Sequence, residues 1–260
     1  MAYVFFDIDE TIYSYTVGIP EPTREAIRLL RANGHHPVIC TGRTQVMIFQ
    51  EILDMGFDGI IAGAGSLVSW RGKELSRRIM PREVSEELIR TLKGEGFSIF
   101  AEGHDDFYYD PEMIDDCLYP IFDIYHVHIP EHFKPLDFTS DMKISKVSAA
   151  YTRYSNRDSA VEKIKDEFNW VDHYGALFET IPKHISKGTG IRFLMDYLGE
   201  GLEETYAFGD SFNDLEMLQT VKHGVVMGNA KESFKKLIPL KTEGMNEGGI
   251  YNALKRFGLI

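Results

Sequence analysis

A short apolar run at the start of the chain ends abruptly in acidic residues. Residues 2–6 (AYVFF) are apolar throughout, and Asp7 and Asp9 follow them directly. A strand that is apolar on both faces is typical of a parallel sheet covered by helices on both sides. In such open α/β sheets, ligands bind beside the carboxyl ends of the strands. The sequence therefore predicts a parallel sheet whose first strand carries carboxylates to a ligand-binding edge.

Alternation of short strands and helices occurs in both terminal parts of the chain. Apolar spacing near the N-terminus predicts helices over residues 23–33 and 44–55, and strands over residues 38–40 and 59–62. Near the C-terminus it predicts helices over residues 186–198, with Ser186 as the N-cap, and over residues 213–220, 231–237 and 249–257. It also predicts strands over residues 205–208 and 224–227. Both parts therefore have the pattern of one α/β core.

The middle of the chain has a different pattern. After a helix over residues 81–93, short alternating runs predict strands over residues 97–101, 107–109, 125–129 and 144–151. A helix over residues 156–168 interrupts them. This pattern is typical of an antiparallel sheet with helices. We therefore predict a discontinuous core, residues 1–80 with 183–260, and an inserted α+β domain, residues 81–182.

A second apolar strand also ends in carboxylates. Residues 205–208 are followed by Asp210 and, in the same turn, Asp214. If both strands lie in one sheet, Asp7, Asp9 and Asp210 converge at one edge, where they would repel one another unless a cation held them. Oxygen ligands without cysteine favour Mg²⁺ over zinc.

Two further features suit a phosphate ligand. Thr41 and Gly42 follow the strand at residues 38–40 and precede a predicted helix, where a hydroxyl and free amides can bind a phosphate. Lys187 lies in the first turn of another predicted helix, an unfavourable place for a cation in the field of the helix dipole. A role in binding an anion would explain that position.

These motifs, in this order, resemble the four motifs of the haloacid-dehalogenase-like hydrolase superfamily. The first is Asp7-Ile8-Asp9-Glu10-Thr11, the second Thr41-Gly42-Arg43, the third Lys187, and the fourth Gly209-Asp210-Ser211-Phe212-Asn213-Asp214, with Gly228-Asn229-Ala230 after it. An insert between the second and third motifs is similar to the cap of the Cof-type phosphatases, cap type IIB. The resemblance implies a Rossmann-like core with an inserted α+β cap domain that sets substrate specificity.

The resemblance also implies a role for each matching residue. Asp7 would be the nucleophile that forms an aspartyl phosphate, and Asp9 the general acid and then the general base. Mg²⁺ would be held by the Asp7 carboxylate, the Asp9 carbonyl and Asp210, with support from Asp214. The phosphoryl oxygens would be bound by the amides of Ile8 and Gly42, the Thr41 hydroxyl, Lys187 and the Asn213 amide.

The first motif and the turn after the third strand depart from the usual family pattern. Glu10 stands where glycine is commonest, which implies a backbone that does not require glycine and adds negative charge beside the site. Ala64-Gly65-Ser66 stands where many relatives have Asn-Gly-Ala, so the asparagine amide is lost and contacts with the substrate are expected to change.

Other candidate sites are weaker. His126, His128 and His132 have a spacing that suits a metal, but lack a cysteine or clear carboxylate partner, which favours a structural role. The glycines at 63 and 65 do not continue into a dinucleotide-binding pattern. Cys40 lies inside an apolar strand and is expected to be inert.

Composition narrows the possible partners. The net charge is −12, with 28 basic and 40 acidic residues, which argues against binding a phosphate polymer such as nucleic acid. No apolar stretch suits a membrane helix or a secretory leader, and the cysteines, Cys40 and Cys117, are too few for a disulfide scaffold. We therefore expect a cytoplasmic protein with reduced thiols, of undetermined oligomeric state.

The expected activity is Mg²⁺-dependent hydrolysis of a small phosphorylated metabolite, such as a sugar phosphate. Two alternatives stay open. The first is a phosphomutase or phosphotransferase, which would release an isomerised product in place of inorganic phosphate. The second is a non-catalytic protein that binds a phosphorylated metabolite, an idea that only Glu10 encourages.

Overall fold

A computed structural model describes residues 1–112, 119–173 and 176–260, so Cys117 lies outside the described residues. The chain forms two compact units. Unit 1 contains Met1–Gly42, Gln50–Arg77 and Ser186–Ile260, and unit 2 contains Arg43–Phe49 and Arg78–Ile185. The sequence had placed residues 43–49 with the core, whereas their packing groups them with unit 2.

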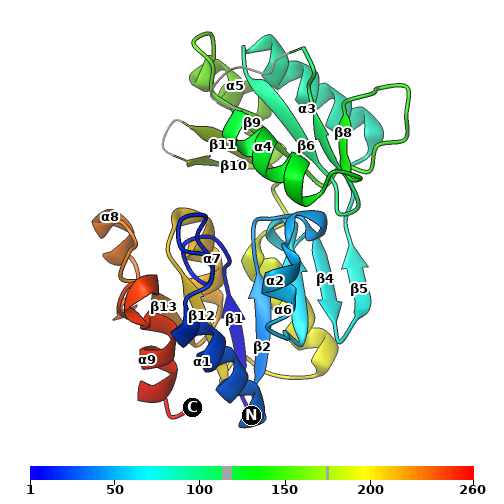
Figure 1. The fold of residues 1–260 in the computed structure, drawn as a ribbon. Helices are drawn as coiled ribbons and strands as arrows, with labels where there is room; N and C mark the ends of the chain where they lie inside the picture. The colour runs from blue at the N-terminus through cyan, green and yellow to red at the C-terminus, as the bar shows by residue number, and fades with distance from the viewer. Residues whose placement is uncertain (113–118, 174–175) are drawn as a thin grey trace. The chain divides into compact units, whose positions relative to one another are not determined.

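Unit 1 is built around one eight-stranded sheet (Figure 1). Its strands run in the order β14 (Leu240–Lys241), β13 (His223–Val226), β12 (Thr205–Gly209), β1 (Tyr3–Phe6), β2 (His36–Cys40), β3 (Gly59–Ala62), β4 (Leu67–Trp70) and β5 (Lys73–Arg77). The first six are parallel, and β4 and β5 add an antiparallel hairpin. The predicted parallel core is confirmed.

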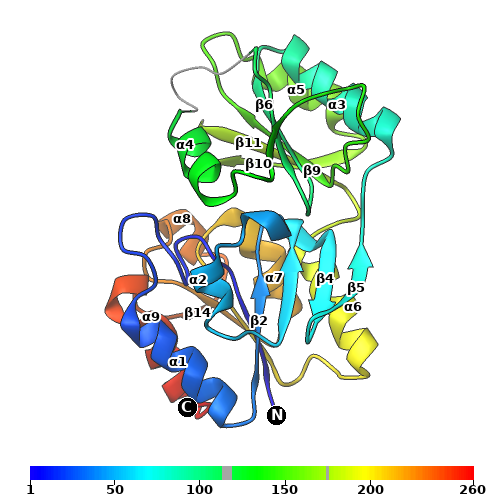
Figure 2. The same cartoon turned by 45° about the vertical axis from the view of Figure 1, so that its right-hand side comes forward.

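Helices cover both faces of this sheet (Figures 1 and 2). One face carries α1 (Glu21–Ala32) and α9 (Gly249–Arg256), and the other α6 (Lys187–Leu198) and α7 (Leu215–Thr220). Two short helices, α2 (Gln50–Leu53) and α8 (Glu232–Lys235), complete the unit. Tyr3 and Phe5 pack with Leu194 of α6 and Met217 of α7 in one buried core. Burial on both faces explains why these strands are continuously apolar.

Unit 2 contains a six-stranded, mainly antiparallel sheet. Its strands run in the order β10 (Phe168–His173), β11 (Leu177–Pro182), β9 (Lys146–Ala150), β6 (Ser98–Glu102), β7 (Phe107–Tyr109) and β8 (Phe133–Pro135). Leu92 of α3 (Arg82–Gly94) and Ile164 of α5 (Arg157–Ile164) pack on one face of this sheet, in a core with Val147. The α+β character expected for the insert is confirmed.

A group of buried charges lies on the same sheet of unit 2. Glu102, Lys146 and Glu179 come from three neighbouring strands, β6, β9 and β11. The Lys146 ammonium is 2.8 Å from Glu179 Oε1 and 3.4 Å from Glu102 Oε2. Burial raises the pKa of Glu102 to about 7, against the opposing effect of the Lys146 charge. The sequence analysis did not identify this group, because its members are far apart along the chain.

The helix predicted over residues 44–55 is confirmed only at Gln50–Leu53, which form α2. The chain instead forms a 3-10 turn at Gln45–Met47, an extended residue at Ile48 (φ −85°, ψ 113°), and only then α2. Met47, Ile48 and Phe49 are buried in succession. One face of an α-helix cannot bury consecutive residues, which are about 100° apart around its axis.

The strand predicted over residues 125–129 is also wrong. This segment belongs to α4 (Tyr119–His128), whose end is closed by the Ile129 N–H donating to Tyr125 O at 2.8 Å. Tyr125 and Ile129 are both buried. The sequence YHVHI fits alternation with period two, but its first and last residues also have the helical spacing of four. No local feature of this sequence distinguishes a strand from a helix.

No helix in the described ranges has the length and apolar character needed to cross a membrane.

Candidate active site

Two neighbouring parallel strands end in aspartates at the same edge of the unit 1 sheet. β1 pairs with β12 so that Phe6 lies opposite Phe208, and the Asp7 N–H donates to Phe208 O at 3.0 Å. Asp7 therefore leaves the end of β1 beside the turn that carries Asp210. Parallel pairing alone brings together two residues that are about 200 positions apart in sequence.

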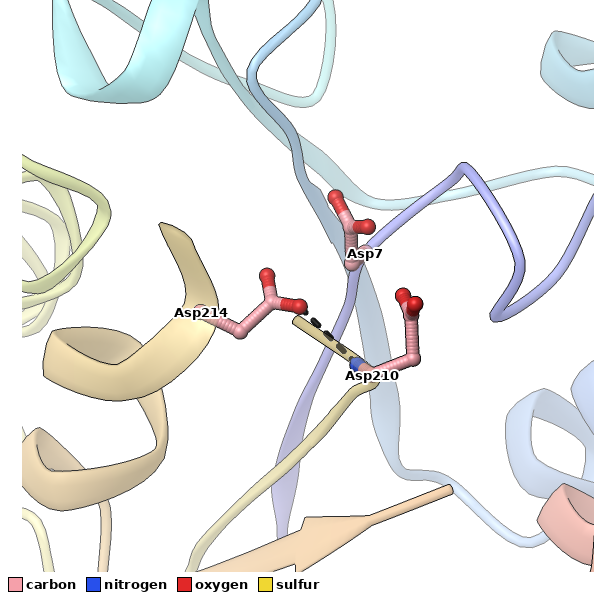
Figure 3. A group of neighbouring side chains, drawn as sticks. All are labelled: Asp7, Asp210 and Asp214. Carbon is pink, nitrogen blue, oxygen red and sulfur yellow. Dashed lines mark hydrogen bonds between the residues drawn. The ribbon is translucent and has the colours of Figure 1, made fainter. Parts of the chain in front are cut away.

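Asp7, Asp210 and Asp214 form a compact carboxylate cluster (Figure 3). One oxygen atom from each lies within 4.8 Å of those of the other two. Asp7 and Asp214 are buried, and Asp210 is partly buried. Figure 3 shows Asp7 and Asp210 on the ends of adjacent strands and Asp214 at the start of the following helical segment. Such a set of oxygen donors suits a hard divalent cation.

Lys187 is the cation that the structure places against this cluster. Its ammonium lies 2.6 Å from Asp7 Oδ1 and 2.5 Å from Asp214 Oδ1, and its side chain is 1% exposed. Lys187 opens α6, whose N-cap is Ser186, and the Ser186 hydroxyl accepts from the Thr189 N–H at 3.0 Å. The predicted N-cap is confirmed. The ion pairs explain why a lysine stands at the positive end of the helix dipole.

Asp214 holds the turn of Asp210 in place. Its Oδ2 accepts the backbone N–H groups of Asp210 at 2.9 Å and Ser211 at 3.1 Å, while its Oδ1 faces Lys187. A methyl group in place of the Gly209 hydrogen would come within 2.5 Å of the Asp214 side chain. Glycine at position 209 therefore allows the buried carboxylate to approach this turn.

The carboxylates of the cluster shift one another's pKa values. Burial raises the pKa of Asp7 to about 7, with a further rise from Asp214 and an opposing effect of Lys187. Burial also raises the pKa of Asp210 to about 9, again with the neighbouring carboxylates adding to the rise. Burial by itself would lower the pKa of Lys187, but the charges of Asp214 and Asp7 outweigh it and raise that pKa. The cluster thus has more negative charge than one lysine offsets.

We expect Lys187→Met to lower the free energy of unfolding of the metal-free protein by about 3–5 kcal/mol, because it leaves two buried carboxylates without their cation. Chemical denaturation measures this loss. The matched control is Lys222→Met, which removes an exposed lysine from the same unit. Equal stability of the two variants would contradict a stabilising role for the buried ion pairs.

Apart from Lys187 of α6, the residues predicted to bind phosphate lie in the segments that follow β1, β2 and β12. Thr41 follows β2, the neighbour of β1, and is buried; its N–H donates to Ile61 O and its carbonyl accepts from the Ala64 N–H, both at 2.9 Å. Gly42 comes next and is partly exposed. Ile8 is buried directly after Asp7, and Asn213, partly buried, receives a hydrogen bond from the Ser211 hydroxyl at 2.6 Å.

Asp9 is not part of the carboxylate cluster, which is formed by Asp7, Asp210 and Asp214. It is partly exposed, one residue beyond the buried Ile8. The Ile8 carbonyl accepts the N–H groups of Thr11, Ile12 and Tyr13, so the chain turns tightly around this point. Asp7 is therefore buried at the start of this turn, whereas Asp9 is partly exposed within it.

Position 10 does not require glycine, as expected, but its backbone lies outside the regions that side chains usually favour. Glu10 has φ +56°, in the left-handed region that favours glycine. Its carbonyl accepts a hydrogen bond of 2.8 Å from the Asn229 side-chain amide. Ala64, the other departure from the family pattern, also has a positive φ, +54°. For a residue other than glycine, such a conformation has a steric cost of about 1–2 kcal/mol.

Asn229 and Thr11 are site residues to which the sequence analysis assigned no role. The side-chain oxygen of Asn229, Oδ1, also accepts from the Met245 N–H at 2.9 Å. The Asn229 side chain therefore connects the first motif to a loop that is distant in the sequence. The Thr11 hydroxyl donates to Asp210 Oδ1 at 3.3 Å. The stretch Gly228-Asn229-Ala230 was the only signal for Asn229, and Thr11 had none beyond its place in the motif.

The residues considered for other roles are not members of this carboxylate cluster. Cys40 is a free, buried cysteine whose thiol pKa is raised by burial, which agrees with an inert packing role. His126 and His128 lie on α4, not on a strand, and His132 Nδ1 is 3.6 Å from Asp106 Oδ1.

Comparisons with known proteins find similar sequences and a similar fold. A family model described as haloacid dehalogenase-like hydrolase matches residues 4–254. "Putative phosphatase YkrA" of Bacillus subtilis (strain 168) is 29% identical over 99% of this chain and 98% of its own length. The 5-amino-6-(5-phospho-D-ribitylamino)uracil phosphatase YitU of the same organism is 26% identical over 98% of this chain and 96% of its own. The solved structure of BT4131, a HAD subclass IIB sugar phosphatase, has a TM-score of 0.87 at 27% identity, with each chain covered completely.

Proposed function

The chain belongs to the haloacid dehalogenase-like hydrolases, and on that premise we propose that it is a phosphatase that hydrolyses small phosphomonoesters in the presence of Mg²⁺. The observation that carries the proposal is the buried cluster of Asp7, Asp210 and Asp214 against Lys187. A reaction between an anionic carboxylate and an anionic phosphate needs nearby positive charge.

The donor set fits Mg²⁺. The cluster offers carboxylate oxygens and neither histidine nor cysteine, which is the ligand chemistry of a hard cation and not of zinc. The raised pKa values of Asp7 and Asp210 report a surplus of buried negative charge, which a divalent ion would neutralise. Asp7, Asp210 and the Asp9 carbonyl would hold the ion, and Asp214, whose oxygens already bind Lys187 and the Asp210 turn, would support it.

Bound there, Mg²⁺ would supply charge that offsets the repulsion between Asp7 and the phosphoryl oxygens. In the proposed reaction, an Asp7 carboxylate oxygen forms a bond to phosphorus while the bond from phosphorus to the ester oxygen breaks. Asp9 gives its proton to the leaving alcohol. A water molecule then attacks phosphorus, Asp9 takes a proton from that water, and the bond from phosphorus to Asp7 breaks, which regenerates both carboxyl groups.

The remaining residues position the phosphoryl group. The Lys187 ammonium, the Thr41 hydroxyl, the amides of Ile8 and Gly42 and the Asn213 side chain are proposed to donate to its oxygens. Ile8, Thr41 with Gly42, and Asn213 follow β1, β2 and β12, and Lys187 opens α6. Donors held in place before the reaction stabilise developing charge without a cost of reorganisation.

We propose a small phosphorylated metabolite as the substrate, such as a sugar phosphate. The names of YitU and BT4131 state activity on a phosphorylated ribitylaminouracil and on sugar phosphates, respectively. A cytoplasmic location is part of the proposal, since such metabolites are found there and Cys40 is a free thiol.

Release of inorganic phosphate from p-nitrophenyl phosphate tests the proposal, followed by a panel of sugar phosphates. We expect one phosphate per alcohol released in Mg²⁺ buffer. An isomerised sugar phosphate without free phosphate would indicate a mutase. Tight binding of panel members without turnover would indicate a binding protein, and either result would contradict the proposed hydrolysis.

A further inference from the structure

Ser211 stands in the turn after β12, between the cluster residue Asp210 and the proposed phosphate-binding residue Asn213. All three belong to unit 1. The Ser211 hydroxyl donates to Asn213 Oδ1 at 2.6 Å. This distance is typical of an O–H···O bond and is shorter than usual for N–H···O. The hydroxyl therefore faces the oxygen of the Asn213 amide and not its nitrogen.

The two ends of the Asn213 amide have opposite hydrogen-bonding properties. Its Oδ1 only accepts hydrogen bonds, whereas its Nδ2 only donates them. Rotation about χ2 exchanges the two ends, and this torsion has broad, roughly twofold preferences. A phosphoryl oxygen is an acceptor, so Asn213 can bind it only through Nδ2. By holding Oδ1, Ser211 presents Nδ2 on the opposite side of the amide.

Ser211 is itself held on both sides by Asp214. Its N–H donates to Asp214 Oδ2 at 3.1 Å, and its carbonyl accepts from the Asp214 N–H at 3.0 Å. Asp214 is buried, and its other oxygen accepts from the Lys187 ammonium at 2.5 Å. The Ser211 hydroxyl thus extends from a fixed backbone and can order the Asn213 side chain before a ligand binds. Ordering such a side chain during binding would cost about threefold to tenfold in affinity.

We propose that Ser211 is a positioning residue, which orients the Asn213 amide so that Nδ2 donates to a phosphoryl oxygen. This inference rests on the proposed function, which assigns the Asn213 amide to the phosphoryl group. Without the Ser211 hydroxyl, the amide has to be ordered when the ligand binds. Once the ligand is bound, the contact is the same, so KM rises while kcat stays nearly unchanged. Removing the amide itself lowers kcat as well, because the contact is then missing in the transition state.

The test compares Ser211→Ala with Ser211→Thr in the full chain. Alanine removes the hydroxyl but keeps the backbone hydrogen bonds of position 211. Threonine keeps the hydroxyl and suits the extended backbone found there (φ −136°, ψ 173°). Asn213→Ala, alone and combined with Ser211→Ala, completes a double-mutant cycle. The matched control is Ser233→Ala, which removes an exposed hydroxyl from α8 of the same unit.

Calorimetry gives the Kd of inorganic phosphate in Mg²⁺ buffer, and p-nitrophenyl phosphate kinetics give KM and kcat. We expect Ser211→Ala to raise Kd and KM about threefold to tenfold and to keep kcat within about twofold of the wild type. Ser211→Thr and Ser233→Ala should match the wild type. Asn213→Ala should raise the Kd at least about tenfold, in line with the loss of a hydrogen bond to a charged group, and should lower kcat. Ser211→Ala should add nothing to the loss in Asn213→Ala.

Unchanged Kd and KM in Ser211→Ala, or an equal loss with and without Asn213, would overturn the inference and leave the proposed hydrolysis in place. A loss in Ser211→Thr equal to that in Ser211→Ala would also overturn it. A wild type that binds phosphate without hydrolysing esters would contradict the proposed function alone, because the Kd cycle still tests Ser211. An unchanged Kd in Asn213→Ala would refute the phosphate role of Asn213 and, with it, the inference.

Discussion

Replacing Asp7 by asparagine is expected to lower kcat for p-nitrophenyl phosphate by at least about 10⁴-fold, because an amide cannot serve as the nucleophile. The side chain is nearly the same size and lies at the end of a buried strand, so the fold should be kept. Burial and Asp214 raise the pKa of Asp7 to about 7. Its charge is therefore costly in the folded state, and the Tm of Asp7→Asn should not fall below that of the wild type by more than a few degrees.

The matched control is Asp196→Asn, which removes an exposed carboxylate of α6 in the same unit. It should keep wild-type kcat and KM. Mass spectrometry of acid-quenched wild-type reactions should show one phosphoryl group on the peptide that contains Asp7, and none in the variant. Turnover by Asp7→Asn within about tenfold of the wild type would exclude Asp7 as the nucleophile.

Removing divalent cations is expected to have the second large effect on the rate of phosphate release. With EDTA, phosphate release should fall by at least about 100-fold, because a metal ion contributes several kcal/mol to charge stabilisation in such reactions. Excess Mg²⁺ should restore it. The variant Asp210→Asn should need far more Mg²⁺ for the same rate, whereas Asp196→Asn should respond as the wild type. Full activity after exhaustive chelation would contradict the proposed metal site.

The same site predicts how stability depends on pH. In the metal-free protein, the folded-state pKa values of Asp7 and Asp210 are raised from 3.8 to about 7 and about 9. The folded protein then holds protons that the unfolded chain has released, so the free energy of unfolding falls as pH rises from about 4 to about 9. Each such proton lowers the free energy of unfolding by up to about 1.4 kcal/mol for each unit that the pH rises.

Magnesium binds the ionised carboxylates, so it should stabilise the protein more at pH 8 than at pH 5. Denaturation at both pH values, with and without Mg²⁺, measures this difference. The Mg²⁺ response should be lost in Asp210→Asn. An equal effect of Mg²⁺ at both pH values would show that it acts elsewhere than on Asp7 and Asp210.

Much of the core and of the candidate site was readable in the sequence. The strands β1 and β12 were predicted because burial on both faces requires continuous apolar runs. Ser186 was predicted as an N-cap because its hydroxyl can satisfy a free backbone amide at a helix start. Asp7 and Asp210 were predicted to meet because parallel strands place their carboxyl ends at one edge. These conclusions depend on local composition and on one rule of sheet topology.

Where two backbone states fit the same residues, the sequence misled. YHVHI alternates like a strand but belongs to α4, and residues 44–55 have helical spacing but are interrupted at Ile48. Glu10 adopts a positive φ although it is not glycine, because its neighbours hold the turn. In each case, contacts with distant residues outweigh local preferences that differ by only about 1 kcal/mol.

The sequence by itself therefore determined the parallel core, the family resemblance and the acidic strand ends, since these follow from which residues must be buried and which must be solvated. Only the tertiary structure decided the contacts between side chains from separate elements. It paired Lys187 with Asp7 and Asp214, gathered Glu102, Lys146 and Glu179 on one sheet, and joined Phe49 to His128. Such contacts depend on how elements distant in the chain pack against one another, which no local pattern of residues encodes.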